Sequence, residues 1–169
     1  KLNFIKEGEL CLILADNCLE YIELYLYFLK SNVKQILVDK NTSESQIDKI
    51  STLYKPNYLI VNNSTKPFLK NYKFVKSYGI YNIYLYSEKK IQIHNDLALL
   101  LSTSGSTGSS RFVKLSKENI LDNALNISKY LKINSSHTTI TTMSPSYSYG
   151  MSIINTHFAK GSKIILNNQ

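Results

Sequence analysis

The residues best suited to chemistry lie in the stretch "LALLLSTSGSTGSSRFVKLS", from Leu97 to Ser116. An apolar run leads into a loop of glycine, serine and threonine, which ends at Arg111, the only arginine of the chain. Glycine lets the backbone approach an anion closely, while hydroxyl and backbone N–H groups donate hydrogen bonds to it. We therefore expect this loop to bind phosphate.

The spacing of the loop excludes three other motifs. A Walker A loop counted from Gly105 has Ser110 where the second glycine is required, and no Lys-Ser/Thr pair follows. A nucleophile elbow needs G-x-S-x-G, but residues 105–108 read G-S-T-G. A dinucleotide fingerprint needs three spaced glycines after the first strand, where residues 15–17 read "ADN". Two interpretations are left: a phosphate loop of another kind that joins one strand to the next, or a plain Ser/Gly surface turn.

The loop resembles the phosphate loop of the adenylate-forming (ANL) superfamily, whose pattern is [ST]-[ST]-G-[ST]-T-G-x-P-K-G-V. Residues 103–108 match its first six positions, and Val113 matches its last. Three positions depart from the pattern, because Ser110 replaces proline, Arg111 replaces lysine and Phe112 replaces glycine. The stretches at 10–39 and 143–166 are also similar to the family. The chain thus resembles the N-terminal part of the AMP-binding domain of an acyl-CoA synthetase or ligase.

The resemblance implies roles for the loop residues. Thr107 and Arg111 are the expected catalytic residues, and Thr107 is also expected near Mg²⁺. A guanidinium can contact phosphate through two N–H groups, whereas lysine offers a point charge. The residues implied to bind the phosphates of ATP are Thr103, Ser104, Gly105, Ser106, Thr107, Gly108, Ser109 and Arg111.

The implied reaction is the activation of a carboxylic acid. The carboxylate attacks the α-phosphate of ATP and gives an acyl-adenylate and pyrophosphate, and the acyl group then passes to the thiol of CoA or of carrier-protein phosphopantetheine. Positioned donors and a cation stabilise the charge on the leaving pyrophosphate. An acyl carrier protein is a possible partner.

Residues 1–169 are expected to form one partial domain, without its C-terminal part and the small lid domain. The later family elements that hold ribose and magnesium are missing from these residues, so we expect the chain alone to form no acyl-adenylate. The alternative is a free-standing phosphate- or nucleotide-binding module that does no chemistry.

A second segment, "SPSYSYGMSI" at 144–153, bears on the substrate. In amino-acid-activating members of the family this segment carries an aspartate that holds the α-amine, and Gly150 stands at that place here. An ammonium group would lose its hydration without gaining a partner, so an ordinary α-amino acid is disfavoured. Tyr147, Tyr149 and Gly150 are candidate pocket residues for a small carboxylic acid. Simple packing remains an alternative for both tyrosines.

The elements around these segments predict an α/β fold. Apolar runs at 10–15, 35–39 and 57–62 indicate buried strands, with helices between them at 18–31 and 43–55. Asn17 and Glu20 resemble a capping box for the first helix. The order predicts a three-layer βαβαβ arrangement, a parallel-type sheet with helices on both faces, and additional β segments. The further elements expected are β segments at 72–87, 97–103 and 111–116, a helix at 117–132, a strand at 138–143, a loop at 144–150, a helix at 151–159 and a strand at 162–167.

Composition sets broader limits. The net charge is +8, but the lysines are interleaved with acidic residues, so we expect no nucleic-acid partner. Cys11 and Cys18 lack a metal-binding spacing and are expected as buried thiols. No apolar run reaches the ~18 residues of a membrane-spanning helix, and we expect a cytoplasmic protein with no integral membrane segment.

Overall fold

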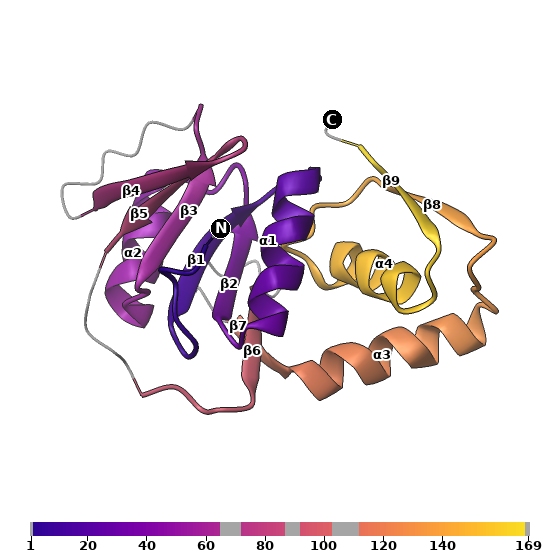
Figure 1. The fold of residues 1–169 in the computed structure, drawn as a ribbon. Helices are drawn as coiled ribbons and strands as arrows, with labels where there is room; N and C mark the ends of the chain where they lie inside the picture. The colour runs from indigo at the N-terminus through magenta and orange to yellow at the C-terminus, as the bar shows by residue number, and fades with distance from the viewer. Residues whose placement is uncertain (1, 65–71, 87–91, 103–111, 168–169) are drawn as a thin grey trace.

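The computed structural model describes residues 2–64, 72–86, 92–102 and 112–167. Helices and strands alternate through most of this length (Figure 1). Their bounds are β1 Leu10–Ala15, α1 Leu19–Lys30, β2 Lys34–Asp39, α2 Glu44–Tyr54, β3 Tyr58–Asn62, β4 Lys73–Tyr78, β5 Tyr81–Leu85, β6 Leu97–Ser102, β7 Phe112–Ser116, α3 Lys117–Tyr130, β8 Thr138–Thr141, α4 Ser148–Ala159 and β9 Lys163–Leu166.

The main sheet has seven strands in the order β4-β5-β3-β1-β2-β6-β7. Its four central strands are parallel, since β1 pairs with β2 and β3, and β2 pairs with β6. The outer strands β5, β4 and β7 are antiparallel to their neighbours. The predicted three-layer α/β fold with additional β segments is therefore confirmed.

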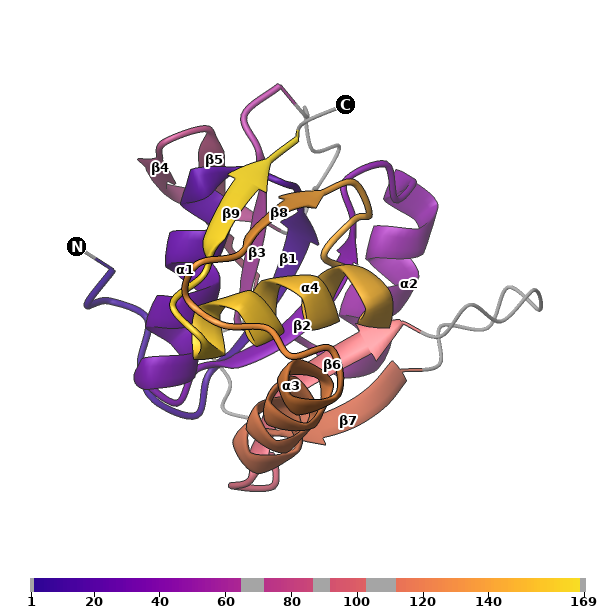
Figure 2. The ribbon, with the colours of Figure 1, turned by 90° about the vertical axis from the view of Figure 1, so that its right-hand side faces the viewer.

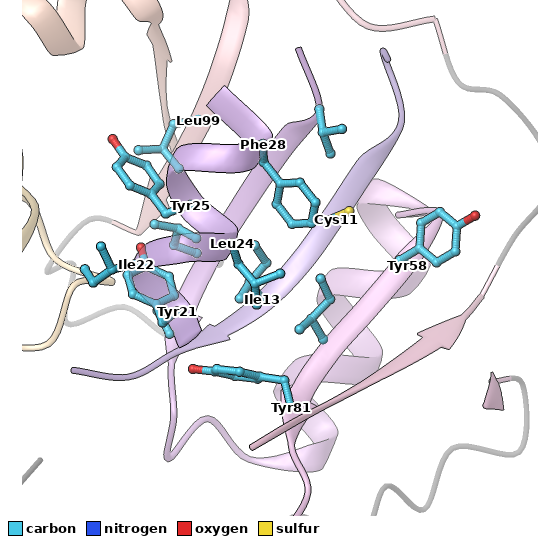
Figure 3. Packing of buried hydrophobic residues seen from close by; sticks show 14 of the residues in the cluster. Cys11, Ile13, Tyr21, Ile22, Leu24, Tyr25, Phe28, Tyr58, Tyr81 and Leu99 are labelled. Atoms are coloured by element: carbon cyan, nitrogen blue, oxygen red, sulfur yellow. The ribbon is translucent and has the colours of Figure 1, made fainter. Parts of the chain in front are cut away.

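Helices cover both faces of the sheet, which explains why its central strands are apolar throughout. All six residues of β1 are buried. Cys11 and Ile13 face α1, while Leu12 belongs to a second cluster that includes Ile47 and Ile50 of α2. Figure 3 shows the α1 side, where aromatic side chains of α1 pack over β1.

Two helix starts show how side chains set element bounds. Ser116 caps α3 as predicted, because its Oγ accepts a hydrogen bond from the Asn119 backbone N–H at 3.0 Å. The prediction for α1 is wrong: its N-cap is Cys18, whose Sγ accepts from the Tyr21 backbone N–H at 3.4 Å. Asn17 is thereby left outside the helix, with its side chain available for a contact elsewhere.

The last third of the chain departs most from expectation. β8 and β9 form a separate two-stranded parallel sheet, which the sequence pattern does not indicate. The helix α4 begins at Ser148, inside the segment predicted as a loop. It packs beside α3, which in turn contacts β6 and β7 of the main sheet (Figure 2).

Candidate functional site

The carboxyl ends of the parallel strands meet at one edge of the main sheet. β1 ends at Ala15, β2 at Asp39 and β6 at Ser102. Ligands of open α/β sheets bind in crevices outside these strand ends. The segment predicted to bind phosphate begins directly after Ser102, so it leaves the sheet at this edge.

The segment 143–147 is fixed at the same edge by two hydrogen bonds. Asn17, just after β1, donates from Nδ2 to the Met143 carbonyl oxygen at 3.2 Å. Ser102, the last residue of β6, donates from Oγ to the Ser146 carbonyl oxygen at 3.5 Å. Since β2 lies between β1 and β6, the segment bridges the ends of the two strands that flank β2.

Serine side chains shape this bridging segment. The Ser144 and Ser146 hydroxyls lie 2.8 Å apart, and the Ser146 backbone N–H donates to Ser144 Oγ at 3.3 Å. The Tyr147 backbone N–H donates to the Ser144 carbonyl oxygen at 3.2 Å. Ser146 is fully buried. The turn at Ser144–Ser146 is thus held by its own hydrogen bonds and by those to Asn17 and Ser102. It sets where α4 begins.

Gly150 is the reason why α4 can begin so close to this turn. A Cβ at position 150 would lie 2.3 Å from the Ser144 carbonyl oxygen and 2.9 Å from that of Met143. Both distances are shorter than real Cβ contacts. In this backbone arrangement, therefore, the position has no room for any side chain, an aspartate included.

The other two candidate pocket residues are exposed. Tyr147 is the N-cap of α4 and is 39% exposed, and Tyr149 in its first turn is 65% exposed. Neither hydroxyl has a hydrogen-bond partner among the described residues. Both tyrosines stand beside the Ser144–Ser146 turn, and neither makes an ion pair or hydrogen bond to a charged group among the described residues.

The predicted phosphate-binding residues, 103–111, lie outside the described residues. Their flanks are described. Phe112, one of the three departures from the family pattern, packs edge-on against Tyr54 of α2 with ring centroids 5.3 Å apart. Its ring therefore belongs to the core on the α2 side of the sheet, not to the edge where the loop leaves.

Two charged groups at this edge pair with each other. Lys40 Nζ, just after β2, lies 3.1 Å from Asp16 Oδ1, just after β1. Next to this pair, Asn17 is 7% exposed, and its Oδ1 has no hydrogen-bond partner among the described residues. Burial raises the pKa of the adjacent Cys18 thiol, which favours its neutral form.

Sequence reasoning missed the roles of Asn17, Ser144 and Ser146. The local spacing around Asn17 predicts a helix cap. Its side chain instead contacts Met143, 126 residues away in the sequence, and local spacing cannot indicate such a contact. The Ser-Pro-Ser order at 144–146 is a turn signal, and it could have indicated a fixed turn but not its partner strands.

Within the ranges that the structure describes, no three His, Cys, Asp or Glu side chains gather as a metal site. None of the described helices is both long enough and apolar enough to cross a membrane.

Comparison with known proteins shows to which family the chain belongs. The model of the family described as "AMP-binding enzyme" matches residues 3–169. The chain belongs to this AMP-binding enzyme family. No curated protein matches the chain by sequence. The family match agrees with the resemblance seen at the phosphate loop, and it extends over nearly the whole chain.

Solved structures of AMP-binding ligases share the fold. The o-succinylbenzoate CoA synthetase of Bacillus subtilis, in complex with its acyl-adenylate intermediate, is 17% identical with a TM-score of 0.79, over 99% of this chain and 45% of that one. A long-chain-fatty-acid-CoA ligase of Archaeoglobus fulgidus is 16% identical with a TM-score of 0.78, over 99% and 37%. ATP-bound MatB of Rhodopseudomonas palustris is 16% identical with a TM-score of 0.79, over 97% and 36%. The chain thus spans less than half the length of these structures.

Proposed function

We propose that this chain supplies the phosphate-binding part of an AMP-forming ligase, which activates a small carboxylic acid with ATP and passes the acyl group to a thiol. The match of the AMP-binding family model to residues 3–169 carries this proposal. The acyl acceptor in it is CoA or a carrier-protein phosphopantetheine. ATP with Mg²⁺ is the co-substrate.

The position of the loop supports ATP binding at the carboxyl edge. The segment 103–111 connects Ser102 of β6 to Phe112 of β7, and both ends of this connection are fixed in the sheet. In the proposal its Ser, Thr and Gly residues donate to the phosphates, and Arg111 neutralises charge on the leaving pyrophosphate. Thr107 is the residue proposed near Mg²⁺.

Residues around the loop have supporting roles in this proposal. Asn17 and Ser102 hold the Met143–Ser146 turn beside the strand ends. Gly150 leaves no side chain that could bind an α-ammonium group, which favours acids without one. Tyr147 and Tyr149 remain candidates for the wall beside the acid.

The test is carboxylate-dependent exchange of pyrophosphate into ATP by the full-length enzyme. Arg111→Ala should raise the KM for ATP about tenfold or more, because hydrogen bonds to charged groups contribute about 1.5–3 kcal/mol. The KM for the acid should change little. Lys114→Ala, which removes an exposed cation from β7, is the matched control. Unchanged ATP kinetics in Arg111→Ala would remove the loop from the proposed site.

The 169-residue chain by itself should show no exchange. Exchange by the isolated chain would refute that expectation. Phosphate or nucleotide binding by an enzyme that fails to exchange with any acid would favour the alternative of a binding module.

A further inference from the structure

Asn17 Oδ1 is one of the buried polar atoms that have no hydrogen-bond partner among the described residues. The others are Gln35 Oε1 and Thr156 Oγ1. Such an atom loses hydration without gaining a partner, which costs stability. Gln35 is the second residue of β2 and Thr156 lies in the second half of α4, whereas Asn17 follows β1 at the carboxyl edge of the main sheet. Of the three, Asn17 is therefore the one beside the candidate site.

The Asn17 side chain has one defined orientation. Its Nδ2 donates to the Met143 carbonyl oxygen at 3.2 Å. The opposite orientation would bring Oδ1 against that carbonyl oxygen, and two acceptors cannot form a hydrogen bond. The contact with Met143 therefore requires that Oδ1 point the other way, where it stays unpartnered. Asn17 is only 7% exposed, so bulk water does not compensate for the missing partner.

Folding alone does not explain an asparagine at this position. Leucine has the same branching and the same number of side-chain heavy atoms, and it would bury no polar atom. It would give up the hydrogen bond to Met143, but it would also remove the cost of the unpartnered Oδ1, and these two effects are of similar size. The asparagine thus adds little to the stability of the fold. What it adds is a fixed position for the Met143 carbonyl group.

This carbonyl group lies between Asn17 and the first turn of α4. Its oxygen accepts from Asn17 Nδ2, and a Cβ at position 150 would be 2.9 Å from the same oxygen. A shift of the Met143 carbonyl group toward α4 would therefore press on the backbone at Gly150, because the two are already in close approach. Tyr147 and Tyr149, the candidates for the wall beside the acid, belong to the same stretch of chain. Asn17 thus controls where this stretch lies.

We propose that Asn17 is a positioning residue for the carboxylic acid. Its amide holds the Met143 carbonyl group, and this group holds the first turn of α4 at the edge where the acid is activated. The effect falls on the acid and not on ATP, because these contacts run through the segment after β8 and not through the proposed phosphate loop. This inference rests on the proposed ligase function and deepens it by giving a kinetic role to a residue of neither segment.

Asn17→Leu in the full-length enzyme tests this role. The readout is pyrophosphate exchange with the best substrate from a panel of straight-chain acids, acetate to octanoate, and benzoate. The KM for the acid should rise about tenfold or more, since a small misplacement of a binding group costs at least this factor. The KM for ATP should stay within about twofold. A smaller folded fraction would instead lower kcat and leave both KM values unchanged, so this split separates positioning from a loss of stability.

Asn63→Leu is the matched control. Asn63 follows β3 at the same edge of the sheet, but it is exposed, and its side chain makes no hydrogen bond to the 143–146 segment. The same substitution at this position should leave the KM for the acid within about twofold of the unmodified value. An equal rise of this KM in Asn17→Leu and Asn63→Leu would overturn the proposal.

Amide hydrogen exchange measures the position of the turn without any turnover. The Ser146 and Tyr147 backbone N–H groups both donate within the turn. In the full-length Asn17→Leu variant these two amides should exchange about tenfold faster, because the turn has lost its tie to β1. The Asn119 amide, which Ser116 caps at the start of α3, should keep its rate.

The two measurements separate failure of this proposal from failure of the ligase function. If no acid of the panel supports exchange of pyrophosphate but the two turn amides exchange faster in Asn17→Leu, the ligase function fails while Asn17 still positions the segment. If acids are activated and their KM does not change in Asn17→Leu, the proposal for Asn17 fails alone. A higher KM for the acid without faster amide exchange would also overturn it, since the turn would not have moved.

Discussion

At the scale of single residues, Gly150 gives the sharpest expectation. Gly150→Ala places a Cβ 2.3 Å from the Ser144 carbonyl oxygen, so the turn or the helix must move. Alanine favours a helix over glycine by about 1 kcal/mol, but overpacking costs about 1–3 kcal/mol. Because backbone on both sides resists the shift, we expect the overpacking cost to lie in the upper half of its range, so that the free energy of unfolding in urea falls by about 1–2 kcal/mol.

The matched control for this substitution is Ser148→Ala, in the same first turn of α4. Ser148 is exposed and its hydroxyl makes no hydrogen bond to a described residue, so the change should stay within about 0.5 kcal/mol. Equal stability of Gly150→Ala and Ser148→Ala would contradict the close approach of helix and turn.

Tyr72 predicts a pH dependence of stability. Its hydroxyl donates to Ser51 Oγ, and burial raises the pKa of Tyr72 from 10.0 to about 12. The folded state then keeps a proton that the unfolded state loses, so this contribution is complete below pH 10 and declines as the pH rises to about 12. Tyr72→Phe should lower the free energy of unfolding at neutral pH by about 0.5–1.5 kcal/mol through the lost hydrogen bond.

The same variant should fall less steeply at high pH, because phenylalanine has no proton to lose. The difference between the two proteins should narrow between about pH 10 and 12, as followed by urea unfolding at each pH. Tyr130→Phe, at a side chain that is 84% exposed, serves as the control. A constant difference across that range would show that Tyr72 does not carry the effect.

At the scale of elements, α4 is fastened to α1 through buried polar contacts. The Tyr25 hydroxyl donates to Asn155 Oδ1 at 2.9 Å, and that of Tyr21 lies 3.4 Å from the Met151 sulfur atom. Tyr25→Phe leaves the Asn155 oxygen without its donor, and we expect a loss of about 1–2 kcal/mol in the free energy of unfolding.

A double-mutant cycle isolates this contact. Asn155→Leu combined with Tyr25→Phe should cost less than the sum of the two single changes, by about 0.5–1.5 kcal/mol. Tyr27→Phe is a control on the same helix, because its hydroxyl has no hydrogen-bond partner among the described residues. Additive effects of Tyr25→Phe and Asn155→Leu would mean that the contact contributes nothing to holding α4.

Elements whose sequence pattern reflects burial could be predicted, and those set by distant contacts could not. The strand Leu10–Ala15 is apolar on both faces because helices cover both, so its sequence indicates its place. The start of α4 depends on the close approach of Gly150 to the carbonyl oxygen of Ser144. In the sequence, the serine, proline and glycine residues of this segment indicate a loop instead. At the candidate site, residue type and spacing predict a phosphate loop at 103–111, which lies outside the described residues, but they do not indicate the bridge from Asn17 to Met143.

At the scale of the whole molecule, the two sheets of the described chain differ in how deeply their strands are buried. The central strands of the main sheet are buried on both faces, with Ile13 and Leu37 fully buried. In the two-stranded sheet, Ile140 and Ile165 pair across β8 and β9 and are 48% and 47% exposed. A two-stranded sheet alone is marginally stable in water, so the second sheet should open more easily than the first.

Amide hydrogen exchange followed by NMR tests this difference. The Ile140 and Ile165 amides should exchange at least about a hundredfold faster than those of Ile13 and Leu37, after correction for intrinsic rates, because local opening needs far less free energy than global unfolding. Ile83 of β5 is an internal control, since it is fully buried although β5 lies next to the outermost strand of the main sheet. If the two exposed isoleucines exchange as slowly as Ile83, the second sheet unfolds only with the whole molecule. That result would mean that the contacts of α4 with β8 and β9 make them one cooperative unit with the main sheet.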